Sequence, residues 1–433
     1  MNEIAAGLIN LALLLVLFLT GIELGFAMAI MGFFGFVYLV NIQAAFNLLA
    51  KDFFDVFSSY GFTVIPLFVF MGQIAFNAGI ARQLFAAAHR FMGHIPGGLA
   101  IATVAGATLF KAICGSSPAT AATFASVAVP EMDRFGYDKR LSTGIVATVG
   151  TLGILIPPSV TLIVFGIITE QSIGKLFMAG LIPGLLIALF FVFIIVAWAK
   201  MNPAIAPRSP KFSWGERMQS LPAVFWPVLI FLVTVGGLLK GFFTPSEAGS
   251  IGTAAVLVLA LIKRTLPWKM FVKSVDEALR TACMVIMLIA GSALLGHFIA
   301  ITNIPTVAAD WIASLPWPRT IIMIIISIFY LLGGSFIDDL AFMILATPIF
   351  YPAIQKLGYD PMWFGIMIGI TVMVGVVIPP VAINVFVVKN ITKTPFSVIY
   401  AGVYPFLLAL VFAGILLFIF PQIALWLPNM LYK

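Results

Sequence analysis

The stretch Gly150-Thr151-Leu152-Gly153-Ile154-Leu155-Ile156-Pro157-Pro158-Ser159 decides the fold, because it places two glycines and two consecutive prolines inside an apolar run. A proline removes a backbone hydrogen bond and clashes with the preceding turn, so a helix that enters this stretch must kink or unwind. The same punctuation returns as Gly375-Val376-Val377-Ile378-Pro379-Pro380, at an offset of 379 − 157 = 222 positions. A break that occurs twice in this way predicts an internal duplication.

Other landmarks of the two halves keep the same offset without a gap. Gly136-Tyr137-Asp138 returns as Gly358-Tyr359-Asp360, and single residues repeat as the pairs Pro130 and Pro352, Gly153 and Gly375, and Pro183 and Pro405. Repeated halves whose apolar helices are interrupted by Gly and Pro are typical of secondary transporters, whose binding site lies near the bilayer midplane.

The composition requires a lipid environment. Of the 433 residues, 62% are hydrophobic and 9% are charged, whereas about a quarter of the residues in ordinary soluble domains are charged. Runs such as Ile4 to Thr20, Leu176 to Ala199 and Ile399 to Phe420 reach the roughly 20 apolar residues that a membrane-spanning helix needs. The first run follows Glu3 rather than a basic segment, so we expect it to remain as a helix and not to act as a signal peptide.

Several function classes have no support in the sequence. The net charge of +7 sits in loops between apolar runs, so it is explained by membrane topology and not by nucleic-acid binding. Cys114 and Cys283 lie in apolar surroundings without metal-ligand spacing. Motifs of metalloproteases, serine hydrolases and phosphate-binding loops are absent, and the chain has three histidines. We therefore regard a membrane-embedded enzyme as a remote alternative.

Basic clusters predict the topology. Lys, Arg and His gather at 82–94, 200–217 and 263–280, and such clusters face the cytoplasm. Three apolar runs precede the first cluster, which places the N-terminus outside. Residues 95–130 must enter and leave on one side if the charged loop 131–140 is also cytoplasmic. This segment is therefore expected to form a re-entrant hairpin.

Each half then contains five crossings and one hairpin, and because five is odd the second half is inverted relative to the first. The expected fold is an all-α polytopic membrane protein with about ten transmembrane helices and two re-entrant helical hairpins. Asp52 and Asp55 are expected in an external loop, and 268–280 as a separate amphipathic helix at the membrane interface. The expected parts are a first repeat at 1–200 with hairpin 95–130 and broken helix 144–168, a cytoplasmic linker at 201–217, and a second repeat at 218–433 with hairpin 319–355 and broken helix 362–388.

The first hairpin carries a polar tip, Gly115-Ser116-Ser117-Pro118-Ala119-Thr120. Non-helical backbone at membrane depth is tolerated only where protein or a water-filled cavity satisfies its N–H and C=O groups. Freed carbonyls and hydroxyl groups offer the hard oxygen ligands that a small cation prefers. The alternative is a tight helix crossing built from small residues.

The second hairpin carries Gly333-Gly334-Ser335-Phe336-Ile337-Asp338-Asp339, so a carboxylate pair replaces the serines. An acid in a membrane segment is costly and indicates function. Asp338 could bind Na⁺, carry a proton or accept hydrogen bonds from backbone amides at the turn. Lys111 and Lys389 are expected to extend toward the membrane surface rather than to contact substrate. His297 and Glu23 are expected to be hydrogen-bonded packing residues.

Helix ends at such breaks direct partial charges into the gap, positive from N-termini and negative from C-termini, so a cation and an anion can share one site. The candidate Na⁺ ligands are Gly115, Ser116, Ser117, Gly153, Pro157, Gly334, Asp338, Gly375 and Pro379. The candidate substrate-binding residues are Ser117, Thr120, Ser159 and Asn384.

These motifs, in this order and spacing, resemble the large membrane subunit of tripartite ATP-independent periplasmic (TRAP) transporters, the DctM-like family. The resemblance covers essentially the whole chain. The residues that carry it are Gly115-Ser116-Ser117, Ala119-Thr120, Pro130-Glu131-Met132, Gly136-Tyr137-Asp138, Gly153, Ile156-Pro157-Pro158-Ser159, Gly334, Asp338, Ile378-Pro379-Pro380 and Asn384. Lys111 is the one departure noted from the family pattern.

The resemblance implies a secondary transporter of the bacterial inner membrane that imports an organic carboxylate together with Na⁺. It implies two partners, a periplasmic substrate-binding protein and a small four-helix membrane subunit, and an elevator mechanism in which a transport domain moves against a scaffold domain. No organic cofactor is expected. The nearest alternative is a carboxylate symporter or antiporter that uses Na⁺ or H⁺ without a binding protein. Which carboxylate is carried does not follow from the sequence.

Overall fold

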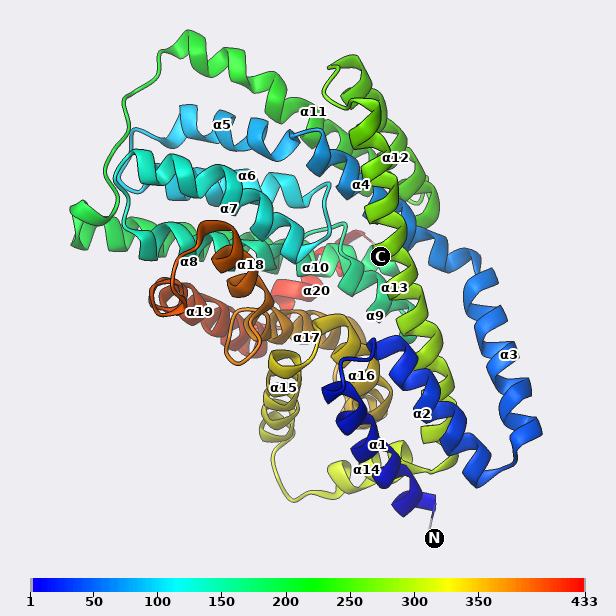
Figure 1. Cartoon of the computed structure of the whole chain (residues 1–433). Helices are drawn as coiled ribbons and strands as arrows, with labels where there is room; N and C mark the ends of the chain where they lie inside the picture. The colour runs from blue at the N-terminus through cyan, green and yellow to red at the C-terminus, as the bar shows by residue number, and fades with distance from the viewer. Residues whose placement is uncertain (1–2, 432–433) are drawn as a thin grey trace.

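The computed structural model describes residues 3–431, which fold entirely into helices and connecting turns (Figure 1). Within that range there is no strand. The first half contains α1 (Glu3–Leu19), α2 (Leu24–Leu39), α3 (Ile42–Ser58), η1 (Tyr60–Thr63), α4 (Val64–Asn77), α5 (Ile80–Met92), α6 (Gly98–Lys111), α7 (Ser117–Arg134), α8 (Lys139–Val149), η2 (Gly150–Ile154), α9 (Val160–Ile168), α10 (Ile173–Met201) and η3 (Pro203–Ile205). The second half contains α11 (Trp214–Leu239), α12 (Pro245–Ile262), α13 (Trp268–Ile301), α14 (Ile304–Ser314), α15 (Arg319–Phe336), α16 (Asp339–Lys356), α17 (Pro361–Gly375), α18 (Ile383–Thr392), α19 (Phe396–Ile419) and α20 (Gln422–Leu431).

Seven of the described helical segments are long and apolar enough to cross a membrane: 60–77, α10, α11, α12, α13, α15 and α19. Further apolar helices, including α1, α2 and α17, are shorter. Large apolar side chains stand on their outer surfaces; on α10, for example, Leu189 is 64% exposed and Phe193 is 72% exposed. An apolar exterior of this kind suits lipid and not water. The expected all-α membrane protein is confirmed.

The duplication is visible in the helix boundaries. Adding 222 to the ends of α7, Ser117 and Arg134, gives 339 and 356, which are the ends of α16. The hairpin α6–α7 therefore corresponds to α15–α16, and the broken pair α8–α9 corresponds to α17–α18. Contacts between the halves are reciprocal, since α7 packs on α18 and α16 packs on α9. Reciprocal contacts are what a two-fold relation between two copies produces.

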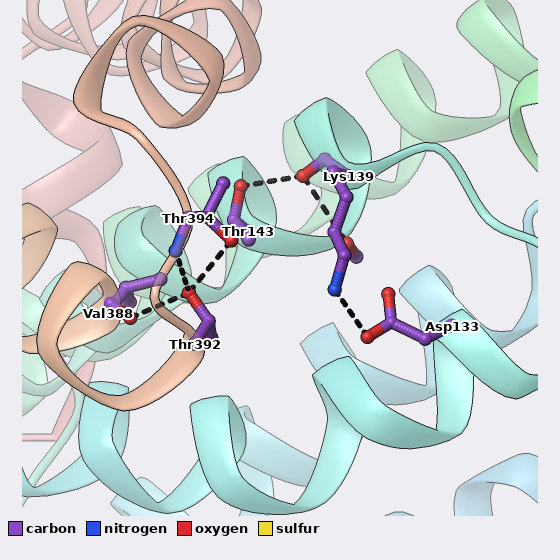
Figure 2. A network of polar contacts seen from close by, with 7 residues as sticks. Asp133, Lys139, Thr143, Val388, Thr392 and Thr394 are labelled. Carbon is purple, nitrogen blue, oxygen red and sulfur yellow. Dashed lines mark hydrogen bonds and ion pairs between the residues drawn. The ribbon is translucent and has the colours of Figure 1, made fainter.

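Both Pro-Pro motifs interrupt their helices as expected. After α8 the chain forms η2 and then lacks regular structure until α9 begins at Val160. After α17 the segment 376–382 is non-helical until α18 begins at Ile383. Figure 2 shows the far end of α18, where Thr392 accepts a hydrogen bond from the Thr394 backbone N–H, lying close to the start of α8. The broken helix of one half thus ends beside the broken helix of the other.

Small residues allow the tightest helix crossings. On the right of Figure 1, α2 lies along α13, and a Cβ atom on Gly291 of α13 would lie 2.0 Å from the Gly25 carbonyl oxygen of α2. On the other side, α8 crosses α19, where a Cβ atom on Gly402 would lie 1.8 Å from the Arg140 carbonyl oxygen. Close backbone approach at small residues is how helices associate in membranes, where lipid removes the hydrophobic driving force.

Two expectations about the outer helices were wrong. The presumed external loop with Asp52 and Asp55 is the 17-residue helix α3. The sequence did not indicate a helix there because its polar residues lower the mean hydropathy of the segment. The presumed interfacial helix at 268–280 is the first part of the 34-residue α13. Asp52 is buried, and its Oδ2 lies 2.8 Å from Nδ1 of His297 on α13. His297 is therefore hydrogen-bonded, as expected, but its side chain is 54% exposed, so it is not a packing residue. Glu23 is exposed as well and is not a packing residue either.

Candidate functional site

The two hairpin tips are built alike. Ser116 caps α7 by accepting a hydrogen bond from the Ala119 N–H on its Oγ at 3.3 Å. Asp338 caps α16 by accepting one from the Ala341 N–H on its Oδ1 at 3.3 Å. Ser116 and Asp338 are 222 positions apart, and so are Ala119 and Ala341, so the two caps occupy equivalent positions of the repeat. Ser and Asp are preferred at helix N-caps because their oxygens satisfy the free backbone N–H groups there.

Both tips border one cavity of about 150 Å³. The first tip contributes Ser116 and Ser117, and the second contributes Asp338. The remaining polar wall comes from Gln73 of α4, Thr161 of α9 and Thr281 of α13. The cavity is smaller than the roughly 300–1,000 Å³ of a typical drug-sized site. It is sized for an ion or a small polar molecule.

In each half a glycine allows close contact between the hairpin tip and the broken helix. A Cβ atom on Gly375 would lie 3.1 Å from the Gly334 carbonyl oxygen, so the second break touches the second hairpin. The Val381 N–H also donates to the Ser335 carbonyl at 3.2 Å. In the first half a Cβ atom on Gly115 would lie 2.8 Å from the Pro158 carbonyl oxygen. Each hairpin is therefore packed directly on the Pro-Pro break of its own half.

Lys111 does not extend to the membrane surface, and that expectation was wrong. Its side chain is fully buried, and its Nζ donates to the Ser116 carbonyl at 2.6 Å. A Cβ atom on Gly153 would lie 2.3 Å from this Nζ. The reason is local: α6 ends at Lys111, one turn before the tip, where the non-helical backbone offers an oxygen to the ammonium. Lys389, in contrast, is half-buried, with its Nζ 3.9 Å from the centroid of the Phe396 ring.

The structure brings two of the candidate substrate residues together. Asn384 of α18 donates from Nδ2 to the Ser117 Oγ at 3.0 Å and to the Ala147 carbonyl at 3.1 Å. Both side chains are buried. This amide therefore ties α18 of the second half to α7 and α8 of the first half.

Of the four candidate substrate residues only Ser117 lines the cavity; Asn384, Thr120 and Ser159 lie behind its wall. The Thr120 Oγ1 donates to the Ser116 carbonyl at 3.0 Å. The Ser159 Oγ donates to the Ile154 carbonyl at 2.7 Å and accepts from the Leu162 N–H, so it caps α9 directly after Pro157 and Pro158. Both are fully buried. In this conformation their hydroxyl groups form hydrogen bonds with backbone groups near the first tip and the first break and do not line the cavity.

Sequence reasoning missed Gln73, Thr161 and Thr281. They line the cavity, but Gln73 and Thr281 lie within the continuous helices α4 and α13, away from the two Pro-Pro breaks. The available signal was a polar residue within a helix, which is shared by many packing and surface residues. Among the described residues no group of three or more His, Cys, Asp and Glu side chains could hold a metal ion. A cation here would depend on backbone and hydroxyl oxygens together with Asp338.

Comparison with known proteins shows the family of this chain. The family described as "Tripartite ATP-independent periplasmic transporter, DctM component" matches residues 11–423. The chain belongs to this family. It is 35% identical over 384 residues to the C4-dicarboxylate TRAP transporter large permease protein DctM of Pseudomonas aeruginosa, covering 88% of this chain and 90% of that protein. It is 29% identical over 415 residues to the sialic acid TRAP transporter large permease protein SiaM of Vibrio cholerae, covering 96% of each.

A solved structure shares the fold. The crystal structure of the Alcanivorax borkumensis YdaH transporter superposes with a TM-score of 0.63 at 12% identity, over 89% of each chain. Such low identity supports the fold and carries no information on substrate. Together with the family match, it makes this DctM-type chain a multi-pass membrane permease of a TRAP transporter. The alternative of a membrane-embedded enzyme is thereby rejected.

Proposed function

We propose that this permease imports an organic carboxylate by coupling it to the inward movement of Na⁺. The observation that carries the proposal is the shared cavity, which is bordered by both hairpin tips and by the start of α9 after the first break. One cavity reached by both inverted halves is the arrangement from which a transporter can present a single site to either side of the membrane.

Two repeat-related cation positions follow from the tips and breaks. The first is formed by Gly115, Ser116, Ser117, Gly153 and Pro157, and the second by Gly334, Asp338, Gly375 and Pro379. In the second, the Asp338 carboxylate accepts backbone hydrogen bonds at the start of α16, from Ala341 and Leu340, and a carboxylate has about four lone-pair positions. Its remaining capacity and negative charge suit Na⁺. Each Na⁺ that moves inward releases about 2.3 kcal/mol per 100 mV of membrane potential.

The anionic substrate is proposed to lie near Ser117, Thr120, Ser159 and Asn384. α7 and α9 begin at this point, and helix N-termini attract negative charge through their free N–H groups. The substrates named in two relatives, a C4-dicarboxylate and sialic acid, support a carboxylate. Rearrangement of the Ser117–Asn384 contact would be needed to free these groups for substrate.

The proposed assembly contains a periplasmic substrate-binding protein that delivers the carboxylate and a small four-helix membrane subunit. The family description, which names a tripartite periplasmic transporter, supports both partners over the binding-protein-independent alternative. We place the chain in the bacterial inner membrane with its N-terminus on the periplasmic side. Transport would follow an elevator mechanism, in which the hairpins and broken helices move together against the outer helices.

The test is uptake into proteoliposomes that contain the chain and its small subunit. We expect uptake of the carboxylate only when an inward Na⁺ gradient and the binding protein are both present. Full uptake with Na⁺ replaced by choline would refute the coupling. Full uptake without the binding protein, still dependent on Na⁺, would instead favour the independent symporter.

A further inference from the structure

We propose that the Lys111 ammonium permanently fills the first cation position, so that of the two repeat-related positions only the second takes Na⁺ from solution. The inference rests on the proposed Na⁺ coupling and specifies where the coupling ion binds. It concerns the one residue that departs from the expected pattern and that the transport site, as described so far, leaves without a role.

The Ser116 carbonyl oxygen has no capacity left for Na⁺. It accepts from the Lys111 Nζ at 2.6 Å, from the Thr120 Oγ1 at 3.0 Å and from the Thr120 N–H at 3.3 Å. A carbonyl oxygen has two lone pairs, and three donors already share them. The oxygen that the first hairpin would offer to a metal ion is therefore used by the chain itself.

The ammonium also lies where an ion bound between the first tip and the first break would sit. A Cβ atom on Gly153 would lie 2.3 Å from the Lys111 Nζ and 2.6 Å from its Cε. The end of the side chain is thus in contact with the break on one side and hydrogen-bonded to the tip on the other. A fixed positive charge holds together the two segments that Na⁺ was expected to join.

The second half has the opposite chemistry at the equivalent positions. With the offset of 222, Lys111 corresponds to Gly333, Ser116 to Asp338 and Thr120 to Phe342. A Cβ atom on Gly333 would lie 1.9 Å from the Phe342 Cζ, so the ring occupies the space into which a side chain at 333 would begin. The chain supplies its own cation to the first position and its own anion to the second.

This difference has a direct consequence for coupling. A cation attached to the chain crosses with the moving segments and returns with them, so it adds no net charge movement over a cycle. A permease with this lysine carries one Na⁺ fewer per cycle than the number of cation positions in its fold. The ammonium remains hydrogen-bonded to the Ser116 carbonyl in every step, including those in which Na⁺ has left.

The test is the number of Na⁺ bound per purified chain, measured by equilibrium binding of ²²Na⁺ over a range of concentrations. Lys111→Met keeps the length of the side chain and removes its charge, and we expect it to bind one Na⁺ more than the wild type. Lys111→Arg retains the charge and should bind the wild-type number. The matched control is Lys389→Met, which makes the same substitution at a half-buried lysine outside the first tip and should leave the number unchanged.

An unchanged or smaller number for folded Lys111→Met would overturn the proposal. If that variant does not fold, the pair Lys111→Gly and Thr120→Phe, which copies the second half, is judged by the same count. On the wild type itself, a cryo-electron microscopy map at saturating Na⁺ should show lysine density on Ser116, and an ion between Ser116 and Gly153 would overturn the proposal.

The same measurement separates this inference from the Na⁺ coupling on which it rests. Asp338→Asn should weaken the Na⁺ binding that the wild type shows by at least about tenfold. A wild type without any Na⁺ binding would reject the coupling itself. Wild-type binding that depends on Asp338, without a gain in Lys111→Met, would reject the role of Lys111 alone.

Discussion

Replacing Gly402 by alanine should separate the two halves of the permease at their closest crossing. A Cβ atom at this position would lie 1.8 Å from the Arg140 carbonyl oxygen, whereas ordinary van der Waals contact begins at 3.4 Å. The helices α8 and α19 must therefore move apart by 3.4 − 1.8 = 1.6 Å. Overpacking of this kind costs about 1–3 kcal/mol, and the better helix propensity of alanine recovers about 1 kcal/mol.

The atom that the added Cβ meets belongs to the backbone, which cannot turn aside, so the overpacking cost lies near the upper end of its range. We expect Gly402→Ala to lower the free energy of unfolding by about 2 kcal/mol on balance, and to reduce uptake. Gly144, which faces Gly402, lies six residues before Gly150, so the displacement occurs about 9 Å along the helix from the first break. The assay is unfolding of the purified chain in detergent, with transport in parallel. The control is Gly236→Ala on α11, whose added Cβ meets nothing within 4 Å and which should stabilise. Equal or greater stability of Gly402→Ala would refute the reasoning.

Two further outcomes are expected. Asp338→Asn should raise the Na⁺ concentration for half-maximal uptake by at least about tenfold. The reason is that at an effective dielectric constant near 20 the attraction between two unit charges 4 Å apart is worth about 4 kcal/mol. An unchanged Na⁺ dependence of uptake would exclude this carboxylate as a ligand. Burial lowers the pKa of His89, whose ring lies 3.1 Å from the Ser209 Oγ. The unfolded chain then binds this proton more readily, so the stabilisation present above about pH 6.5 declines as pH falls toward the folded-state pKa, and His89→Gln should show a shallower loss of melting temperature between pH 7 and 5.5.

The breaks and the duplication were predictable because their cause is local. The pairs Pro157-Pro158 and Pro379-Pro380 each remove two adjacent backbone N–H donors, so each pair interrupts a helix. A single proline such as Pro183 is accommodated inside the continuous helix α10. The offset of 222 positions is a property of the sequence alone. Capping by Ser116 and Asp338 follows the same logic, since short polar side chains compete for free backbone N–H groups at helix ends.

Features that depend on where a segment lies in three dimensions were not predictable. The helix α3 carries Lys51, Asp52 and Asp55, which lower its hydropathy although Asp52 is buried against His297. Only the partner across the helix interface explains that burial. Thr281 lines the cavity because α13 passes the second hairpin, and no motif within α13 indicates this contact.

Lys111 combines both situations. A lysine near a helix end in an apolar segment ordinarily extends to the surface, and the sequence offers no reason to reject that course. The decisive fact is that the hairpin turns inside the protein at 112–116, so the nearest acceptor is the Ser116 carbonyl and not water. Under the proposed Na⁺ coupling, an ammonium held there changes the energetics of import. With Na⁺ at both positions, the entry of one carboxylate charge leaves one net positive charge moving inward, and about 2.3 kcal/mol per 100 mV assists it. With Na⁺ at the second position alone, the co-transport of one Na⁺ with one carboxylate charge is electrically neutral. Accumulation of the carboxylate then depends on the Na⁺ concentration gradient rather than on the membrane potential.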